Sequence, residues 1–196
     1  MIRAVLGGSF DPVHTGHIAM VDHILVNGLA DLVMLVPAWR SPHKTAQAAS
    51  PTDRLAMVKL AFSHRDSVEI DDREIAGGRV AYTVDTLAEM RSQYADDELR
   101  LVIGADQLAV FDAWYRPGRI LELVELVVLA RPGHQLDASG LVGQGWPTDR
   151  IHLCPDFHEP VASSEIRAMI GRGELPAEFL PPPVLEYIRR EDLYGV

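Results

Sequence analysis

The sequence has little of several features that would each point to a class of protein. It has one cysteine, Cys154, among 196 residues, which excludes an internal disulfide framework and a cysteine-rich zinc site. No apolar run approaches the roughly 18 residues that a membrane helix needs. The first residues, MIRAVLGGSFDP, include no basic region and no small-residue cleavage site, so we expect no secretory signal. Basic residues are also few: 18 Lys and Arg against 28 Asp and Glu give a net charge of −10. This balance disfavours a nucleic-acid-binding protein, which needs a basic face.

The remaining composition is that of an ordinary globular protein. Hydrophobic residues make up 47% and charged residues 23% of the chain, enough to build a core. The length predicts a single domain over residues 1–196, with helices from about residue 160 packed on it. We expect a cytoplasmic protein without nucleic-acid or membrane partners, and leave self-association into a homo-oligomer open. Residues 133–148, rich in Gly and Gln, are expected to form a mobile surface loop.

Short apolar runs alternate with helical patterns along the chain. The predicted strands are residues 2–6, 32–36, 68–70, 99–103, 126–130 and 151–154. The predicted helices begin near Gly16, after a Ser50 cap and at a Thr83 cap, and also cover residues 105–111, 117–124, 163–170 and 183–190. Continuous apolar runs are typical of buried parallel strands, and right-handed crossovers place helices on both faces. The pattern therefore predicts an α/β fold with a doubly wound parallel sheet.

The first strand–loop–helix unit is the best candidate for a ligand site, because ligands collect at the carboxyl ends of parallel strands. Its loop reads GGSFDPVHTGH from Gly7 to His17. Gly7 and Gly8 let a ligand approach the backbone closely, and the helix that follows offers free N–H groups to a phosphate. His14 and His17 are three residues apart, so they face the same way on a first helical turn. Together these features predict a polyphosphate site.

Each feature alone has a simpler explanation. Two glycines after a strand are usually just a turn, and a histidine pair could hold zinc, although no third and fourth ligands are obvious nearby. The lysine and Ser/Thr of a P-loop are missing, and so is the G-x-G-x-x-G pattern of dinucleotide redox sites. We favour the phosphate site because all of the features fall on one strand–helix junction.

The run GGSFDPVHTGH resembles the signature of the nucleotidyltransferase superfamily with the HxGH motif. The rest of the chain is similar to the bacterial nicotinate-nucleotide adenylyltransferases in PAWRSPHK (37–44), YTVDTL (82–87), GAD (104–106) followed by Trp114 and Tyr115, VASSEIR (161–167), and the closing VLEYIRREDLY. Two residues depart from the pattern: Ser41 stands where a second proline is usual, and Ala162 where a serine is usual. Neither departure touches the histidines.

The resemblance implies a Rossmann-like nucleotidyltransferase fold and a defined reaction. Nicotinate mononucleotide and ATP would give nicotinate adenine dinucleotide and pyrophosphate, in NAD biosynthesis, by in-line attack of the mononucleotide phosphate on the α-phosphate of ATP. That phosphate is already anionic, so the reaction needs positioning and charge neutralisation rather than a general base. Mg²⁺ is expected to arrive with ATP, held through one or two carboxylates and the phosphates.

The site residues implied by the resemblance fall into three groups. The catalytic group is His17, His14, Lys44 and Arg167. The ATP-binding group is Gly7, Gly8, Ser9, Phe10, Gly104, Asp106, Ser163, Ser164, Ile166 and Arg131. The mononucleotide-binding group is Thr83, Trp114 and Tyr115, with Trp114 stacked on the pyridine ring.

Some of these residues also have a structural interpretation. Lys44 can be a solvated surface lysine, and Trp114 a lid over the core. Asp106 can cap the helix that follows it, and Ser163 and Ser164 can cap theirs. We favour a double role for the two serines, as caps of a helix that also holds the triphosphate.

Five other functions remain open. Phosphopantetheine adenylyltransferases and cytidylyltransferases share the first motif, but lack the PHK loop and the aromatic pair. Nicotinamide mononucleotide differs from the acid by an amide, and backbone donors do not show in a sequence. A non-catalytic nucleotide sensor would keep the fold, although intact His14, His17, Lys44 and Arg167 argue against it. An RNA-binding relative of the class I aminoacyl-tRNA synthetases is disfavoured by the net charge.

Overall fold

The computed structural model describes residues 1–40, 48–134, 136 and 146–195. Six parallel strands form one sheet in the order β3-β2-β1-β4-β5-β6. They are β1 (Ile2–Gly8), β2 (Leu32–Pro37), β3 (Val68–Ile70), β4 (Glu98–Gly104), β5 (Glu125–Leu129) and β6 (Ile151–Cys154). All six predicted strands are confirmed, with ends that differ by at most two residues. Most of the expected loop 133–148 lies outside the described residues, as do Ser41 and Lys44.

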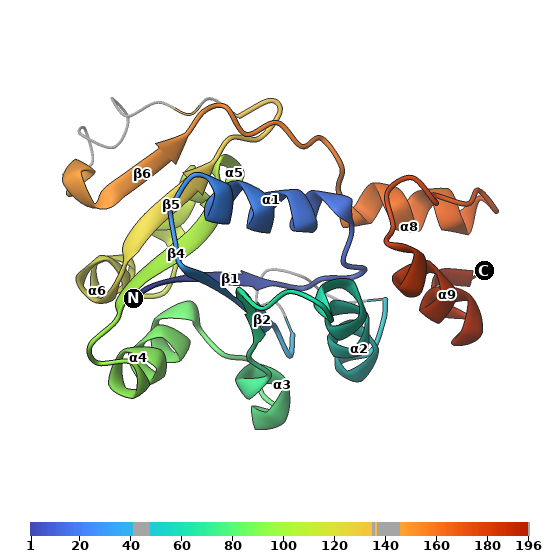
Figure 1. The fold of residues 1–196 in the computed structure, drawn as a ribbon, viewed down its shortest axis with the longest axis horizontal. Coiled ribbons are helices and arrows are strands. Elements are labelled where there is room, and N and C mark those ends of the chain that lie inside the picture. Colours follow the sequence, from blue (N-terminus) through green and yellow to red (C-terminus); the bar gives the residue numbers. More distant parts are fainter. Residues whose placement is uncertain (41–47, 135, 137–145, 196) are drawn as a thin grey trace.

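Helices cover both faces of the sheet, as the doubly wound prediction requires. They are α1 (Thr15–Val26), α2 (Pro51–Phe62), α3 (Arg73–Gly77), α4 (Thr83–Gln93), α5 (Ala105–Leu108), α6 (Pro117–Leu123), α8 (Ser163–Gly171) and α9 (Pro182–Arg190), with 3-10 turns η1 (Phe111–Ala113), η2 (Thr148–Arg150) and η3 (Leu193–Gly195). Buried side chains of α1, α2, α8 and α9 pack in one cluster, and those of α4 and α6 in another. In Figure 1, α1 lies above the sheet and α4 below it.

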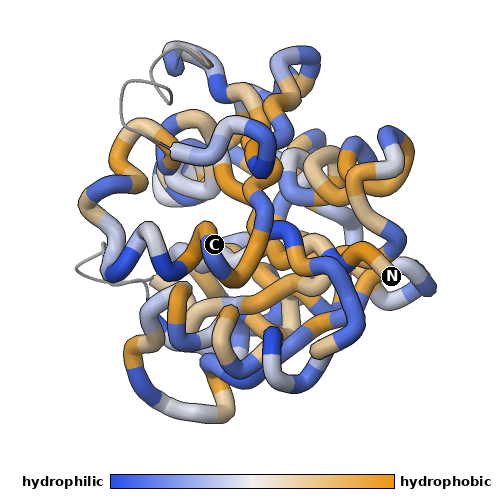
Figure 2. The backbone as a smooth tube through the Cα atoms, turned by 90° about the vertical axis from the view of Figure 1, so that its left-hand side faces the viewer, coloured by the Kyte–Doolittle hydropathy of each residue, from blue (hydrophilic) through white to orange (hydrophobic). Residues whose placement is uncertain are grey.

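The strands are apolar throughout because both of their faces are buried. Successive side chains of a strand point to opposite faces. Ala4 and Leu6 of β1 therefore join the cluster with α1, while Val5 between them joins the cluster with α4. Figure 2 shows the result: hydrophobic stretches run through the middle of the molecule, and hydrophilic stretches lie mostly at its edge.

The last two helices, α8 and α9, extend the first core beyond the sheet. Figure 1 shows them together at one end of the molecule, beside the C-terminus. Ile166 and Ile170 of α8, and Val184 and Ile188 of α9, are at most 3% exposed and belong to the cluster that contains α1 and α2. The C-terminal segment is thus tied to the same core as the first strand–helix unit.

Helix starts were predicted less well than strands. The Ser50 cap is confirmed, since its hydroxyl oxygen accepts a hydrogen bond from the Asp53 N–H at 3.1 Å. The Thr83 cap is wrong: Thr83 is the first helical residue, and Tyr82 stands at the cap position without a side-chain hydrogen bond. The single helix expected over residues 105–111 is divided into α5 and η1. The five-residue α3 was not foreseen, because it is too short to show a helical period.

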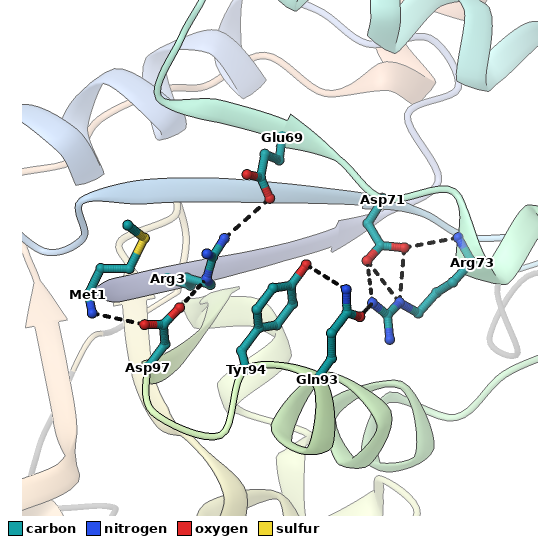
Figure 3. Close-up of polar contacts among 8 residues, drawn as sticks. All are labelled: Met1, Arg3, Glu69, Asp71, Arg73, Gln93, Tyr94 and Asp97. Atoms are coloured by element: carbon teal, nitrogen blue, oxygen red, sulfur yellow. Dashed lines mark hydrogen bonds and ion pairs between the residues drawn. The ribbon is translucent and has the colours of Figure 1, made fainter.

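Ion pairs join segments near the amino end of the sheet (Figure 3). Arg3 of β1 donates to Asp97 at 2.5 Å and to Glu69 of β3 at 3.2 Å, and the amino group of Met1 donates to Asp97 at 2.9 Å. The hydrogen bonds from Arg3 and from the amino terminus lower the pKa of Asp97. These contacts hold the start of β1 against the loop that leads into β4.

Among the described residues, no helix combines the length and the apolar character that crossing a membrane requires. The two longest described helices, α1 and α2, have 12 residues each.

Candidate functional site

The strand order reverses between β1 and β4, and a cavity opens at that point. In open parallel sheets this reversal leaves a crevice at the carboxyl ends of the strands, where ligands bind. The cavity has a volume of about 570 Å³, within the usual range for small-molecule sites. Nine sequence-predicted site residues line it: Gly7, Gly8, Ser9, His17, Thr83, Gly104, Asp106, Trp114 and Arg131.

His17 reaches the cavity from the first turn of α1. Its Nδ1 atom accepts a hydrogen bond from the backbone N–H of His14 at 3.2 Å. Because Nδ1 acts as an acceptor, the proton of the neutral ring is on Nε2. The hydrogen bond to the His14 backbone therefore fixes the orientation of the His17 ring.

His14 lies behind His17, not on the cavity wall. The two ring centroids are 3.8 Å apart, and His14 is only 4% exposed. Burial, together with the nearby positive charge of Arg131, lowers the pKa of His14 to about 4. Its Nδ1 atom has no hydrogen-bond partner among the described residues. His14 is therefore a neutral, buried ring at pH 7 that supports His17.

Gly16, between the two histidines, is required by packing. A Cβ atom at this position would come within 2.8 Å of a methyl group of Val161 and within 3.0 Å of the His14 ring. Real Cβ atoms essentially never approach that closely. The glycine thus lets the start of α1 pack against both neighbours.

Asp106 and Arg131 face each other across the cavity wall. The Arg131 Nε atom lies 3.6 Å from Asp106 Oδ1, and that oxygen is buried without a hydrogen-bond donor among the described residues. A Cβ atom on Gly104 would come within 2.3 Å of the same oxygen. Gly104 takes the cap position of α5, and Asp106 has no capping bond, so the interpretation of Asp106 as a cap is wrong. Its carboxylate instead faces the end of β4.

The late motif, VASSEIR at residues 161–167, contacts the loop after β1 rather than the cavity. The Ser163 hydroxyl donates to the Pro12 carbonyl at 3.0 Å, and Arg167 donates to the Asp11 carbonyl at 2.5 Å. Capping by Ser163 and Ser164 is wrong, because α8 begins at Ser163 and Ala162 takes the cap position.

Several predicted residues do not line the cavity. Phe10 is buried with its backbone at φ 49°, and its ring contacts His17 at a centroid distance of 4.9 Å. Ile166 is fully buried in the core, and Ser164 is exposed. The cavity lining also lacks His14, Ser163, Arg167 and Tyr115. Lys44 lies outside the described residues.

Aromatic side chains enclose the other end of the cavity. Trp114 packs on Phe111 at a centroid distance of 5.3 Å, and its indole N–H is buried without a partner among the described residues. At the rim, Tyr115 lies against Tyr82 at 4.6 Å, and both are almost half exposed. Trp114 thus offers a flat apolar wall to a ring bound in the cavity.

Two charged residues near the site were not predicted from the sequence. Glu74 of α3 lines the cavity and accepts a hydrogen bond from the Thr86 hydroxyl at 2.8 Å; burial raises the pKa of Glu74. Its neighbour Arg73 binds Asp71 at 2.6 Å and so anchors α3 (Figure 3). No sequence signal marks Glu74, because α3 itself leaves none.

Arg54 of α2 is the second such residue. It is fully buried, although charged side chains are rarely buried without partners. The sequence does contain a signal for Arg54, because it shares a helical face with Met57, Val58 and Phe62, all of which are buried. A charge on an apolar face indicates a structural or functional partner inside the protein.

No group of three or more His, Cys, Asp or Glu side chains that could hold a metal ion occurs in the described parts of the chain. The carboxylates on the cavity wall are those of Asp106 and Glu74. One or two carboxylates, completed by substrate phosphates and water, are the usual protein contribution to a Mg²⁺ site.

Comparison with known proteins matches nearly the whole chain to one family. Residues 5–169 match the cytidylyltransferase-like family. The chain is 37% identical to a probable nicotinate-nucleotide adenylyltransferase of Borrelia turicatae (strain 91E135), over 97% of this chain and 96% of the relative. It is 34% identical to a protein of the same name from Cellvibrio japonicus (strain Ueda107), over 97% of each.

The fold is also found among solved structures. The Plasmodium falciparum nicotinic acid mononucleotide adenylyltransferase complexed with NaAD matches with a TM-score of 0.84 at 17% identity, over 98% of this chain and 97% of that one. The same enzyme complexed with APC matches with a TM-score of 0.80. At this identity the likeness concerns the fold, and it confirms the Rossmann-like architecture.

Proposed function

The chain belongs to the nicotinate-nucleotide adenylyltransferases of the cytidylyltransferase-like family, and from this premise we propose that it joins nicotinate mononucleotide to the adenylyl group of ATP and releases pyrophosphate. The observation that carries the proposal is the cavity between the ends of β1 and β4, with His17 at one side and Trp114 at the other. It has room for a nucleotide next to a phosphate-binding loop. The reaction belongs to NAD biosynthesis, and we propose that it takes place in the cytoplasm.

The phosphate half of the site lies beside β1. The mononucleotide phosphate attacks the α-phosphate of ATP in line, and pyrophosphate leaves. His17 donates its Nε2 proton in a hydrogen bond to the phosphates, where negative charge shifts during the transfer. Arg131 adds a positive charge from the end of β5, and Lys44, which comes after β2 in the sequence, adds another. Gly7, Gly8, Ser9 and Phe10 present backbone to the triphosphate.

The residues of the late motif support this half. Arg167 and Ser163 hold the Asp11 and Pro12 carbonyls, so they fix the loop that presents its backbone. We assign Ser164 and Ile166, through the start of α8, to the same end of the triphosphate. On the β4 side, the free oxygen of Asp106 accepts a hydrogen bond from a ribose hydroxyl, with Gly104 leaving the space for it.

The pyridine half lies beside Trp114. The pyridine ring stacks on the indole, and the ring carboxylate accepts hydrogen bonds from backbone N–H groups near Thr83 and Tyr115. A carboxylate needs donors only, whereas the amide of nicotinamide mononucleotide also needs an acceptor. We therefore propose that the acid is the preferred substrate.

Mg²⁺ would be bound together with the triphosphate. The donor set fits this ion, because the cavity wall offers the carboxylates of Asp106 and Glu74 and the phosphates supply further oxygens. When bound, the ion supplies charge neutralisation at the phosphates.

The test is steady-state pyrophosphate release with ATP, Mg²⁺ and one of three acceptors: nicotinate mononucleotide, nicotinamide mononucleotide or phosphopantetheine. We expect turnover with the first at a kcat/KM at least tenfold above the second, and none with the third. Equal use of the two pyridine nucleotides would contradict the preference but not the chemistry. Turnover with phosphopantetheine alone, or with none of the three, would refute the proposed function.

A further inference from the structure

The buried guanidinium of Arg54 links two loops at the phosphate half of the site. One of its nitrogens donates to the Ser9 carbonyl at 2.7 Å, and another donates to the Trp39 carbonyl at 2.8 Å. Ser9 follows β1 and Trp39 follows β2, so a single side chain from α2 holds the ends of two neighbouring strands. The planar fork of Arg suits two acceptors at once, which Lys could not replace.

The bond to Ser9 sets the direction of the next amide. A trans peptide is planar, so its C=O and N–H point in opposite directions. With the Ser9 carbonyl turned to Arg54, the Phe10 N–H is turned away from Arg54, and it donates to no described residue. Phe10 also has a left-handed backbone, at φ 49°, which a bulky residue adopts only when its surroundings impose it. Gly8 and Ser9, immediately before it, line the cavity.

Asp11 holds the other end of this loop. It is 3% exposed, and its carboxylate accepts from the Ala48 and Ala49 N–H groups at 2.9 and 3.1 Å. The third donor is the Tyr194 hydroxyl, at 2.8 Å. Asp11 and Arg54 also attract each other electrostatically. The Asp11 carboxylate and two nitrogens of the Arg54 guanidinium are therefore hydrogen-bonded to groups that fix the loop, while Arg54 Nε has no partner among the described residues.

Tyr194 comes from the far end of the chain, in the 3-10 turn η3. Its backbone has φ 66°, and Asp192 nearby has φ 51°, so two non-glycine residues adopt the left-handed region in the segment that delivers the hydroxyl. Burial beside Asp11 raises the pKa of Tyr194, so the phenol stays protonated and donates its hydrogen bond. Nothing in the reaction described above uses this residue.

We propose that Tyr194, Asp11 and Arg54 form a positioning relay that holds residues 8–11 in the shape that presents the Phe10 N–H to the transferring phosphates. None of the three needs to touch substrate. The relay acts through backbone orientation, and small misplacements of donors around a reacting group are costly to rate. The proposal rests on the proposed adenylyl transfer and deepens it.

The test is Tyr194→Phe, with Tyr187→Phe as a matched control. Tyr187 of α9 also donates its hydroxyl to a carboxylate, that of Asp53 of α2, at 3.0 Å, but this contact does not reach the loop. We expect Tyr194→Phe to lower kcat about tenfold and to weaken ATP binding about fivefold, with KM for the mononucleotide within twofold. Tyr187→Phe should leave kcat and both KM values within twofold, while both variants melt within a few degrees of the parent.

A double-mutant cycle separates a relay from general loosening. Because the hydroxyl acts through the Asp11 carboxylate, Tyr194→Phe should have little further effect on kcat in an Asp11→Asn background. If Tyr194→Phe lowers kcat by the same factor in the Asp11→Asn background as in the parent, the relay is overturned. A kcat of Tyr194→Phe within twofold of the parent, or an equal loss in Tyr187→Phe, would also overturn it.

Calorimetric binding of α,β-methylene-ATP gives a readout without turnover. We expect about fivefold weaker binding by Tyr194→Phe and unchanged binding by Tyr187→Phe. If the parent protein binds the analogue in this pattern but releases no pyrophosphate, the proposed function fails while the relay stands. If the parent turns over and the analogue binds both variants equally, the relay fails while the function stands.

Discussion

At the scale of single residues, burial gives two histidines of one motif different properties. His17 has one ring nitrogen bound to backbone and lines the cavity, whereas His14 is buried behind it and neutral at pH 7. The sequence shows only that they are three residues apart. Their division of roles follows from what surrounds the start of α1. Burial and the charge of Arg131 act on His14, and Val161 lies against Gly16; both residues come from later in the chain.

We expect His17→Ala to lower kcat by roughly two orders of magnitude or more, because it removes a donor that stabilises charge in the transition state. His17→Asn keeps an N–H donor near the same place and should recover part of that loss. Single-turnover rates with saturating substrates would show both effects. Near-normal turnover by His17→Ala would remove the basis for its catalytic role.

His14 makes the stability of the fold depend on pH. Its pKa falls from an ordinary 6.5 to about 4 on folding, so between these values the unfolded chain binds a proton that the folded chain excludes. The contribution of His14 to the free energy of unfolding is therefore fully present above about pH 6.5. It is lost as the pH falls towards 4, and the loss amounts to about 3 kcal/mol. Urea unfolding measures the free energy of unfolding at pH 7 and at pH 4.5. The decrease between these two pH values should be about 2 kcal/mol smaller for His14→Asn than for the parent. Equal losses in the two proteins would contradict the buried, neutral ring.

Trp114 belongs to the pyridine half of the proposed site. We expect Trp114→Ala to raise KM for nicotinate mononucleotide about tenfold, by loss of a stacking partner, with KM for ATP within twofold. Trp114→Phe keeps an aromatic face, so its KM for nicotinate mononucleotide should stay within about threefold of the parent value. An ATP-side defect in initial-rate measurements would show that the two halves of the site are assigned the wrong way round.

At the scale of elements, packing overrides local preference at the start of α1. Alanine has a better helix propensity than glycine by about 1 kcal/mol, yet a methyl group at Gly16 collides with Val161 and His14. Gly16→Ala should therefore destabilise the protein by about 1 to 3 kcal/mol and lower kcat. Gly118→Ala, in α6, meets no atom within 4 Å and should be neutral or slightly stabilising. Urea unfolding measures both; equal effects would rule out the collision.

The elements differ in how far the sequence predicted them. The strands were predicted well, because burial on both faces leaves continuous apolar runs that end at turn residues. Ser50 was recognisable because its cap is a local contact with Asp53. Thr83, Ser163 and Ser164 were misplaced as caps, since a hydroxyl near a helix start is compatible with several starting residues and only the three-dimensional contacts select one.

At the scale of the whole molecule, alternation of strands and helices was enough to predict a doubly wound sheet. The position of the cavity follows from the strand order, with β1 beside β4, and that order is a property of the assembled sheet. Glu74 and Arg54 escaped prediction for the same reason. The partner of Glu74, Thr86, is its neighbour only after folding. Arg54 did leave a signal, a charge among the apolar residues of α2, but its partners Ser9 and Trp39 are also neighbours only after folding.

The bond between Tyr194 and Asp11 spans 183 positions of the chain, which has a consequence for synthesis. The ribosome makes Asp11 long before it makes Tyr194. A nascent chain can assemble β1, α1 and the rest of the sheet while this loop still lacks its last hydrogen bond. The loop therefore gains this hydrogen bond only after Tyr194 has been made and placed, and a chain that stops before Tyr194 lacks it.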